Sequence, residues 1–358
     1  MKIAMNTGGG DAPGLNAAIN AATLAALRRG WEVYGIQNGY GSLFSDQPFT
    51  PLTAQRVRGI TMLGGTILGT ANRGNPFEMP RKTKEGIWVA EDRSDQVIEA
   101  FEKHGMDALV AIGGDGSMYI ADQLTRKGLK IVGIPKTIDN DIWGCDVTLG
   151  FDTAVTTATE AIDKITTTAE AHRRIMVVEV MGRYAGWIAL HSGLSASADV
   201  ILIPEIPFQI QSVVEKIMER EKSGRTYSIV VVAEGAKEMG GTQFVKGKEI
   251  GQAEQLGGVA SYLEKELSER TGKESRSLVL GHLQRGGTPS TFDRLISLRF
   301  GAAAIRAVGD KDFNKLVAMQ ENEIRRIPIS AIAGKMKSVP VDGDTIRTAR
   351  EIGICLGD

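Results

Sequence analysis

Short apolar runs, each followed by a glycine-rich or charged loop and then by a helical pattern, recur along the chain. They lie within residues 2–30, 107–128, 130–141, 174–193, 199–208, 227–238 and 276–287. Continuous runs of Val, Ile and Leu are typical of parallel strands that are buried on both faces. Strands that alternate with helices predict an α/β fold, in which ligands bind beyond the carboxyl ends of the strands. We therefore expect the polar groups of these loops to converge.

The length of 358 residues favours two lobes over one core. Loops up to about residue 145 carry Gly and Asp, whereas loops after about residue 170 carry Arg, His and Glu. We predict two Rossmann-like, three-layer α/β/α lobes with mainly parallel sheets and an active site in the cleft between them. The lobes are residues 1–145 and 146–310, with the chain crossing back between them, and residues 311–358 pack back on both.

Composition excludes several classes of function. The formal net charge of -1 gives no reason to expect a nucleic-acid or membrane partner. Two cysteines, Cys145 and Cys355, lie far apart and predict neither a disulfide framework nor a zinc site, but a reducing cytoplasm. The N-terminus lacks the long apolar segment of a signal peptide, and no apolar run approaches the ~20 residues that span a bilayer.

The stretch "NTGGGDAPGLN" (residues 6–16) follows a predicted strand and opens a predicted helix. Glycines there let backbone N–H groups approach an anion, and a helix N-terminus favours negative charge. The alternative is a tight strand-to-helix turn without a ligand. The glycine spacing fits neither GxGxxG nor GxxxxGK[ST], which argues against an NAD-dependent dehydrogenase and against a P-loop.

Carboxylates follow two later strands. In "GGDGS" (113–117), Asp115 suits a Mg²⁺ ion that bridges to phosphate oxygens, and the alternative is a helix N-cap. In "PKTIDND" (135–141), Asp139 and Asp141 suit a general base and a group that orients it or helps to hold the metal. Here the alternative is that both are ordinary turn residues.

Cations dominate the second half. Arg183, His282 and Arg285 follow predicted strands, where arginine forks suit phosphate, and Glu234 is placed to accept hydrogen bonds from sugar hydroxyls. Arg174 and Arg276 instead precede their strands, on the wrong side for the same site, and fit a neighbouring subunit's site better. Together these groups predict phosphoryl transfer to an acceptor that already carries a phosphate.

Six ordered motifs resemble those of the 6-phosphofructokinases: "GGGDAPG", "GGDGS", "PKTIDND", "VVEVMGRYAG", "AEGA" and "GHLQRGG". The resemblance covers residues 1 to about 310. It implies transfer of a phosphoryl group from ATP, with Mg²⁺, to the 1-hydroxyl of fructose 6-phosphate in glycolysis. Sedoheptulose 7-phosphate is a close analogue that such a site could also accept.

The resemblance also implies residue roles. Asp139 is the base, Thr137 contacts the transferring group, Arg183 stabilises its charge, and Asp115 binds Mg²⁺. The implied donor-binding residues are Gly10, Arg73, Gly74, Gly114, Asp115, Gly116 and Ser117. Arg73 is chosen from the stretch "GTANRGNPF" (69–77), which matches the family's donor-side arginine loop loosely and carries one residue more. The implied substrate-binding residues are Thr137, Ile138, Asp139, Arg174, Met181, Gly182, Arg183, Glu234, Arg276, His282, Leu283, Gln284 and Arg285.

Arg174 and Arg276 match family arginines that reach in from an adjacent subunit, so a dimer is the minimum and the resemblance suggests a tetramer. The positions that match the family's nucleotide-effector arginines are the uncharged Asn20, Leu24, Leu63 and Thr166. Regulation at that site is therefore expected to be weak or absent.

Two alternatives to an ATP-dependent kinase stay open: a pyrophosphate-dependent phosphotransferase, and a non-catalytic sugar-phosphate-binding homologue. The second predicts loss of Asp139 or Asp115, and both are present. For the donor, Gly116 favours ATP. By the family resemblance, pyrophosphate-dependent relatives carry an aspartate at this position, in a "GGDD" loop, and that aspartate would occupy the place of the α-phosphate of ATP. Lys136 favours pyrophosphate. Exclusion sets specificity more strongly than attraction, so Gly116 decides for ATP.

Overall fold

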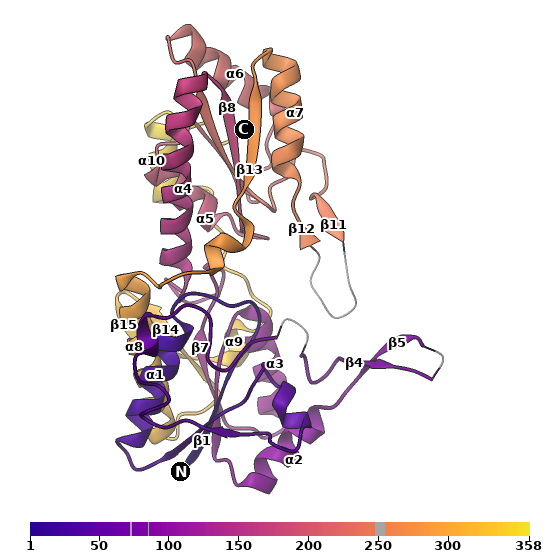
Figure 1. Ribbon diagram of the computed structural model, residues 1–358, viewed down its shortest axis with the longest axis vertical. Coiled ribbons are helices and arrows are strands. Elements are labelled where there is room, and N and C mark those ends of the chain that lie inside the picture. Colours follow the sequence, from indigo (N-terminus) through magenta and orange to yellow (C-terminus); the bar gives the residue numbers. More distant parts are fainter. Residues whose placement is uncertain (72–73, 85, 248–254) are drawn as a thin grey trace. The chain divides into compact units, whose positions relative to one another are not determined.

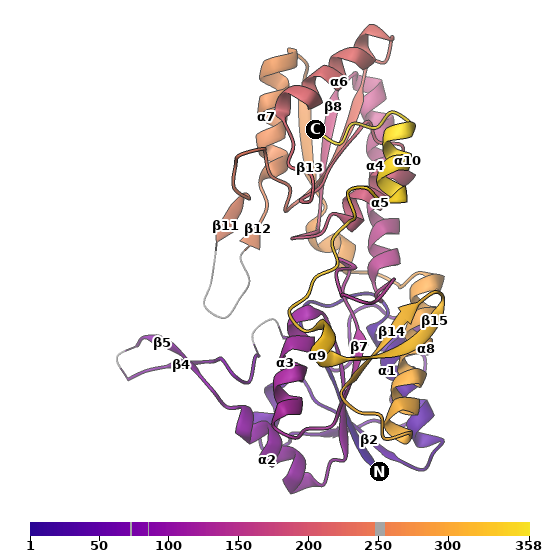
Figure 2. The same cartoon turned by 180° about the vertical axis from the view of Figure 1, so that it is seen from behind.

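The computed structural model describes residues 1–71, 74–84, 86–247 and 255–358 (Figures 1 and 2). The chain divides into two compact units, each with its own sheet. Of the described residues, unit 1 contains 1–152 and 285–337, and unit 2 contains 153–247, 255–284 and 338–358. The fold is α/β with mainly parallel central sheets, as the alternating pattern predicts.

Unit 1 is built on a seven-stranded sheet of order β15-β14-β7-β6-β1-β2-β3. The strands are β1 (Lys2–Thr7), β2 (Glu32–Gly35), β3 (Thr50–Pro51), β6 (Ala108–Gly113), β7 (Ile131–Pro135), β14 (Lys315–Gln320) and β15 (Glu323–Pro328). Only the outermost strands, β3 and β15, pair in antiparallel fashion. Every residue of β6 and β7 is buried, which explains why these strands read as unbroken apolar runs.

Helices cover both faces of this sheet (Figures 1 and 2). Helices α1 and α8 pack together on one face, and α3 packs against α9 on the other. The helices of unit 1 are α1 (Leu15–Leu27), α2 (Ser94–His104), α3 (Asp115–Arg126), α8 (Thr291–Gly309) and α9 (Ile329–Ile332), with short 3-10 turns at Gly41–Phe44 and Ile60–Met62. A separate hairpin, β4 (Met79–Lys82) with β5 (Trp88–Glu91), extends from the unit.

Unit 2 is built on a four-stranded parallel sheet of order β13-β8-β10-β9. The strands are β8 (Ile175–Val180), β9 (Val200–Leu202), β10 (Ser228–Ala233) and β13 (Ser275–Val279), and β11 (Val245–Gly247) pairs with β12 (Gln255–Leu256) beside them. The helices are α4 (Phe151–His172), α5 (Trp187–Ser195), α6 (Ile210–Lys222), α7 (Val259–Thr271) and α10 (Asp344–Glu351). A 3-10 turn at Gly281–Arg285 follows β13. Helices α6 and α7 pack together, as do α5 and α10.

The chain crosses between the units differently from the predicted boundaries. Residues 285–310, predicted in the second lobe, belong to unit 1, where α8 packs against α1. The end of the chain is divided: β14 and β15 complete the sheet of unit 1, and residues 338–358 belong to unit 2. Contacts over long sequence separation decide these assignments, and local composition does not contain them.

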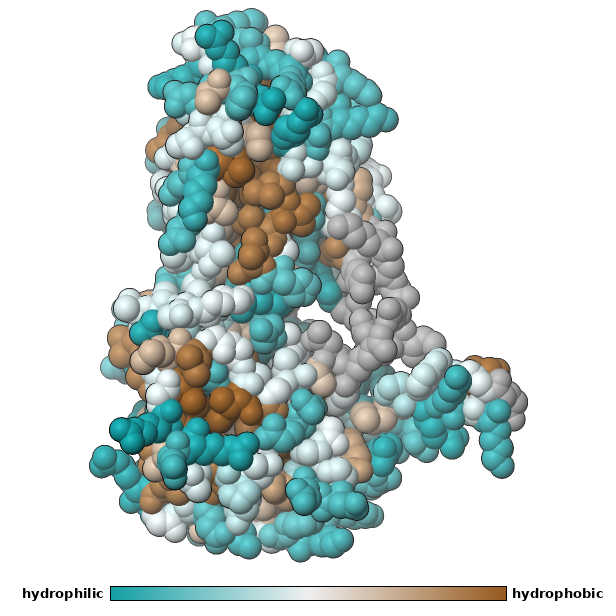
Figure 3. Space-filling model, in the orientation of Figure 1, coloured by the Kyte–Doolittle hydropathy of each residue, from teal (hydrophilic) through white to brown (hydrophobic). Residues whose placement is uncertain are grey.

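Apolar side chains gather at two places on one face (Figure 3). In unit 1 the patch lies over α1 and α8. The exposed large apolar residues of α1, of α8 and of the 3-10 turn at Ile60–Met62 with the residue after it are Leu24, Met62, Leu63, Phe292 and Leu295. In unit 2 the patch lies between α4 and α7, over the sheet. Among the described residues, no helix combines the length and the apolar character that crossing a bilayer requires.

Candidate active site

In unit 1, the predicted loops meet at the carboxyl ends of three neighbouring strands. The parallel register places Thr7 of β1 beside Ile112 of β6, and Gly113 of β6 beside Pro135 of β7. The chain therefore leaves β1, β6 and β7 at one edge of the sheet. This brings together the three loops that begin at Gly8, Gly114 and Lys136, as the sequence predicts for parallel strands.

Glycine is required where these loops touch. A Cβ on Gly8 would lie 2.7 Å from Ser117 Oγ, and one on Gly113 would lie 2.3 Å from the same atom. A Cβ on Gly10 would lie 2.7 Å from Nη1 of Arg285, which donates a hydrogen bond to the carbonyl of Asp11 at 3.0 Å. The loop after β1 thus lies directly against a serine and an arginine, and side chains would separate them.

Gly116 differs from these glycines, because a Cβ built on it would meet no atom within 4 Å. It is the second residue of α3, which begins at Asp115. The N-cap is Gly114, without a side-chain capping hydrogen bond, so the reading of Asp115 as an N-cap is wrong. Asp115 is instead the first helical residue at a glycine-lined N-terminus.

Lys136 lies at the centre of this edge. Its side chain is only 3% exposed, and its Nζ donates a hydrogen bond to the carbonyl of Gly10. Burial, followed by the charge of Arg285, lowers the pKa of Lys136 to about 8. The carboxylates Asp11, Asp139 and Asp141 oppose this shift. The lysine is thus a buried cation among backbone carbonyls and acids.

Thr137 organises the two predicted carboxylates. Its Oγ1 accepts a hydrogen bond from the backbone N–H of Asp139 at 3.1 Å, and its side chain also hydrogen-bonds to Asp141. Burial raises the pKa of Asp141, whose buried Oδ1 has no hydrogen-bond partner among the described residues. Burial, and then the charge of Asp141, also raises the pKa of Asp115. The charges of Lys337 and Lys136 oppose the shift at Asp141, but burial outweighs them.

Other predicted donor-side and substrate residues differ in accessibility. Ile138 is fully buried, so only its backbone can face a ligand. Gly74 is half-buried, whereas Arg73 lies outside the described residues. Thr70, which the sequence reading did not select, donates a hydrogen bond to the carbonyl of Gly9 and fixes the glycine loop from the side.

In unit 2, the loops after β8 and β10 are neighbours, because Val180 pairs with Ala233. Gly182 has a φ of 132°, a left-handed conformation that requires glycine. Arg183 is half-buried, and its guanidinium lies over the ring of Tyr184, 5.8 Å from the centroid. Glu234 follows β10 directly and is also half-buried. The predicted cation and acid therefore lie on adjacent loops.

The residues of the turn after β13 differ in their exposure to solvent. His282 and Leu283 are exposed, whereas Gln284 is fully buried. Gln284 Oε1 accepts a hydrogen bond from the N–H of Met181 at 3.3 Å, and Gln284 Nε2 donates to the carbonyl of Gly281. The amide of Gln284 therefore joins the turn to the loop after β8, and it serves the fold of that loop.

Arg174 and Arg276 lie at the opposite edge of the same sheet, as their positions before and at the start of strands predict. Arg174 Nε is 2.6 Å from Glu274 Oε2, and Arg276 Nη2 is 2.5 Å from Glu274 Oε1. The hydrogen bond from Arg174 lowers the pKa of Glu274. Strand β8 has six residues, about 20 Å, between Arg174 and the loop that carries Arg183.

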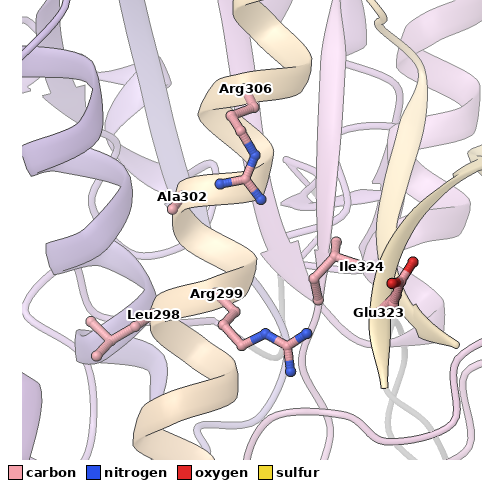
Figure 4. Close-up of a pocket in the computed structure, with 6 residues that line it drawn as sticks. All are labelled: Leu298, Arg299, Ala302, Arg306, Glu323 and Ile324. Atoms are coloured by element: carbon pink, nitrogen blue, oxygen red, sulfur yellow. The ribbon is translucent and has the colours of Figure 1, made fainter. Parts of the chain in front are cut away.

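A shallow hollow of about 520 Å³ lies elsewhere on unit 1, between α8 and β15 (Figure 4). Its lining residues are Leu298, Arg299, Ala302, Arg306, Glu323 and Ile324. None of the predicted site residues lines it. The groups with chemical capacity are instead those at the loop edges of the two sheets.

Comparison with known proteins agrees with this arrangement. The sequence pattern of the phosphofructokinase family, described as "Phosphofructokinase", matches residues 2–308. A protein of Chloroflexus aurantiacus named ATP-dependent 6-phosphofructokinase is 46% identical over 358 residues, which are 100% of this chain and 98% of that protein. A protein of Amycolatopsis methanolica named pyrophosphate–fructose 6-phosphate 1-phosphotransferase is 47% identical over 345 residues, which are 95% of this chain and 96% of that protein.

Among solved structures, Pichia pastoris phosphofructokinase in the T-state superposes with a TM-score of 0.80 at 32% identity. The match covers 98% of this chain but 36% of the yeast chain, so this chain spans about a third of that protein's length. Sequence and fold thus agree over nearly the whole of the present chain. The chain belongs to the phosphofructokinase family.

Proposed function

We propose that this chain is an ATP-dependent 6-phosphofructokinase, which phosphorylates the 1-hydroxyl of fructose 6-phosphate to give fructose 1,6-bisphosphate for glycolysis. Relatives that bear the name of this activity and match over nearly their full length support the proposal. The position of two half-buried acids at the same sheet edge as a glycine-lined helix N-terminus also supports it. Two free cysteines and substrates that occur in the cytoplasm are consistent with a cytoplasmic enzyme.

Asp139 is the proposed base. It takes the proton of the 1-hydroxyl as that oxygen bonds to the γ-phosphorus, while the bond from this phosphorus to the β–γ bridging oxygen breaks and ADP leaves. The hydrogen bond from the Asp139 N–H to Thr137 Oγ1 supports this role, because it orders the loop that presents the carboxylate. Thr137 contacts the transferring group.

The loops around Gly10 and Gly114 are the proposed donor-phosphate cradle, together with Ser117, Gly74 and Arg73. Glycine at positions 8, 10 and 113 allows the close packing of these loops, and α3 begins at this edge with the helix N-terminus that favours an anion. Arg285 and Lys136 supply positive charge next to the glycine loop.

Mg²⁺ is the proposed cofactor, with Asp115 as its carboxylate ligand. The residues fit this ion, because the pKa values of Asp115 and Asp141 are raised and Asp141 Oδ1 is a buried acceptor without a partner among the described residues. Mg²⁺ usually takes one or two protein carboxylates together with phosphates and water, and Asp115 with Asp141 could supply such carboxylates. When bound, Mg²⁺ would neutralise charge on the donor phosphates.

In unit 2, Arg183 is proposed to stabilise charge on the transferring phosphoryl group. Met181, Gly182 and Glu234 are proposed to bind the sugar, and His282 its 6-phosphate. Arg285, which belongs to unit 1, is proposed to contact the same phosphate. The exposure of His282 and Leu283 supports their availability to a ligand.

Gly116 carries the choice of ATP over pyrophosphate. The open space beside its backbone supports entry of the α-phosphate and nucleoside that pyrophosphate lacks. A pyrophosphate-dependent enzyme is the second candidate, supported by the buried Lys136 at the phosphate edge. The lysine attracts either donor, whereas an aspartate at position 116 would exclude only ATP, so we place the specificity in Gly116.

The deciding experiment is a coupled assay of the purified protein with fructose 6-phosphate, Mg²⁺ and either ATP or pyrophosphate. We expect turnover with ATP and little with pyrophosphate. A preference for pyrophosphate would mean that Lys136, rather than Gly116, determines the phosphoryl donor. Absence of turnover with both donors would favour a non-catalytic sugar-phosphate-binding protein.

The active enzyme is proposed to be a homo-oligomer, a dimer at minimum and a tetramer by family resemblance. Arg174 and Arg276 support this, because both lie at the sheet edge opposite Arg183 and could serve only another subunit's site. The apolar patches over α1 and α8 and between α4 and α7 supply surfaces that a second copy could cover (Figure 3).

A further inference from the structure

The loops that carry Arg183 and Glu234 are in direct backbone contact. The N–H of Glu234 donates to the carbonyl of Val180 at 2.9 Å, and the N–H of Gly235 donates to the carbonyl of Gly182 at 3.3 Å. A Cβ on Gly235 would lie 1.9 Å from the carbonyl oxygen of Arg183. Only glycine permits this approach, so the relative position of the two loops is specified at this point.

One side chain from the segment that follows the loop of Glu234 binds both loops. Gln243 Nε2 donates to the carbonyl of Arg183 at 3.2 Å and to the carbonyl of Gly235 at 3.0 Å. A carboxamide nitrogen has two N–H groups, so both bonds can form at once. Gln243 therefore links the loop that carries Arg183 to the loop that carries Glu234.

The backbone on either side of Gln243 is itself fixed. The next residue, Phe244, packs against the apolar core of unit 2, and its ring lies 5.2 Å from that of Tyr262 on α7. The carbonyl of Phe244 accepts a hydrogen bond from Gly257 at 3.0 Å. The hydroxyl of Tyr262 is bound in turn by Glu238 at 2.6 Å. Gln243 thus reaches the two loops from an anchored position.

We propose that Gln243 is a positioning residue for Arg183, and that it sets the distance between the Arg183 guanidinium and the groups that hold the sugar. The proposal rests on the proposed function, in which Arg183 stabilises charge on the transferring phosphoryl group. A preorganised charge loses its effect when it is displaced, and a 1 Å error in placement can cost about 100-fold in rate. Gln243 makes no contact with substrate in this role.

The kinetic test replaces Gln243 by Leu, and by Glu, which keeps the shape but lacks the N–H donors. We expect kcat to fall about 10- to 100-fold in both variants, with the KM for ATP changed less than about two-fold. Gln211→Leu is the matched control, because the exposed Gln211 donates a hydrogen bond to the surface residue Glu215 on α6, so its loss should leave kcat unchanged.

A double-mutant cycle separates positioning from a general structural role. If Gln243 acts through Arg183, then Gln243→Leu in an Arg183→Ala background should lower kcat by less than about two-fold further. Full additivity of the two losses, or an unchanged kcat in Gln243→Leu, overturns the proposal. Thermal unfolding of each variant identifies any loss that comes from unfolding.

Hydrogen exchange gives a readout that does not depend on activity. Loss of the two hydrogen bonds of Gln243 should speed exchange of the Gly235 amide at least ten-fold in Gln243→Leu. Unchanged exchange at this amide overturns the proposal even if kcat falls. If the wild type shows no phosphofructokinase activity, the proposed function fails, and the exchange measurement still decides whether Gln243 holds the two loops together.

Discussion

The loop edges of the two sheets are built differently. In unit 1, Lys136, Asp139 and Asp141 lie at one edge, where the lysine is buried and interacts with the two half-buried acids. In unit 2, the candidate groups are divided between opposite edges, with Arg183 at one and the Arg174–Glu274–Arg276 cluster at the other. One chain thus presents these candidate groups of unit 1 together, whereas it divides the candidate groups of unit 2 between two places.

The sharpest test of the unit 1 edge is Asp139→Ser. Loss of the general base should lower kcat by about 10²- to 10⁴-fold and leave both KM values close to normal. Steady-state kinetics with ATP and fructose 6-phosphate measure this. Asp95→Ser, which removes an exposed carboxylate on α2, is the control. A kcat near that of the wild type would remove Asp139 from the chemistry.

Gly116→Asp tests donor selection at the same edge. The new carboxylate would lie against the α-phosphate at a cost of several kcal/mol, so kcat/KM with ATP should fall by at least about 100-fold. The variant should fold, because the space beside Gly116 is open. Gly116→Asn adds similar bulk without charge and separates the two causes. With Lys136 present, Gly116→Asp can gain pyrophosphate activity, and full ATP activity would refute the steric argument.

Arg174→Ala tests the divided arrangement of unit 2. A charge-assisted hydrogen bond to the sugar phosphate is worth about 1.5–3 kcal/mol, so the KM for fructose 6-phosphate should rise about 10- to 100-fold while the KM for ATP is kept. Arg173→Ala is the control, since Arg173 is a neighbouring exposed arginine that is not part of the proposed site.

Mixed oligomers sharpen this test. Chains with Arg174→Ala, mixed with chains carrying Asp139→Ser, should regain part of the activity, because a hybrid contains some sites with both residues intact. Each homomeric variant is the baseline. If mixing restores nothing although hybrids form, both residues act within one chain, and Arg174 does not serve the site of a neighbouring subunit.

Lys136→Met tests how much the burial of a charged lysine at the loop edge of unit 1 lowers the free energy of unfolding. The pKa of Lys136 is about 8 in the folded protein against 10.5 in the unfolded chain, so the charged lysine destabilises the fold. The variant should raise the free energy of unfolding at pH 7 by up to about 3 kcal/mol. Between pH 8 and 10.5 the unfolded chain binds the extra proton, so wild-type stability rises with pH and the difference shrinks.

Denaturant unfolding at several pH values measures this difference, with Lys103→Met on the surface of α2 as the control. A lower stability of Lys136→Met at pH 7 would mean that the hydrogen bond to Gly10 and the neighbouring acids outweigh the burial of the charge.

The smallest effect is expected from ADP as an effector. The positions that match the family's effector arginines are uncharged, and Leu24 and Leu63 are exposed there. Saturation curves for fructose 6-phosphate should keep the same shape with and without ADP, at concentrations that do not inhibit through the donor site. A shift from sigmoidal to hyperbolic curves would contradict this.

Much of the fold follows from local pattern. The strand that ends at Gly113 and the helix that begins at Asp115 are both readable, because an unbroken apolar run must be buried on both faces and glycines mark its end. The same reasoning places Arg174 and Arg183 at opposite ends of β8. These features depend only on neighbouring residues.

Other features depend on contacts that no local pattern contains. Glu274 holds two arginines from two strands, and Gln243 joins loops 60 and 8 residues away. Both are ordinary polar residues in polar stretches. The return of α8 to unit 1 is similar, because its packing on α1 involves residues almost 300 positions apart. Three-dimensional packing alone identifies them.

Two neighbouring strands in the sheet of unit 1 are far apart in the sequence, which has a consequence for synthesis on the ribosome. Strand β7 ends at Pro135, but its neighbour β14 begins at Lys315, and the whole of unit 2 apart from its last segment is synthesised between them. At 5–20 residues per second, the edge of β7 waits about 10–40 seconds for its partner. An unpaired apolar strand is a template for aggregation, so the nascent chain is most vulnerable in that interval.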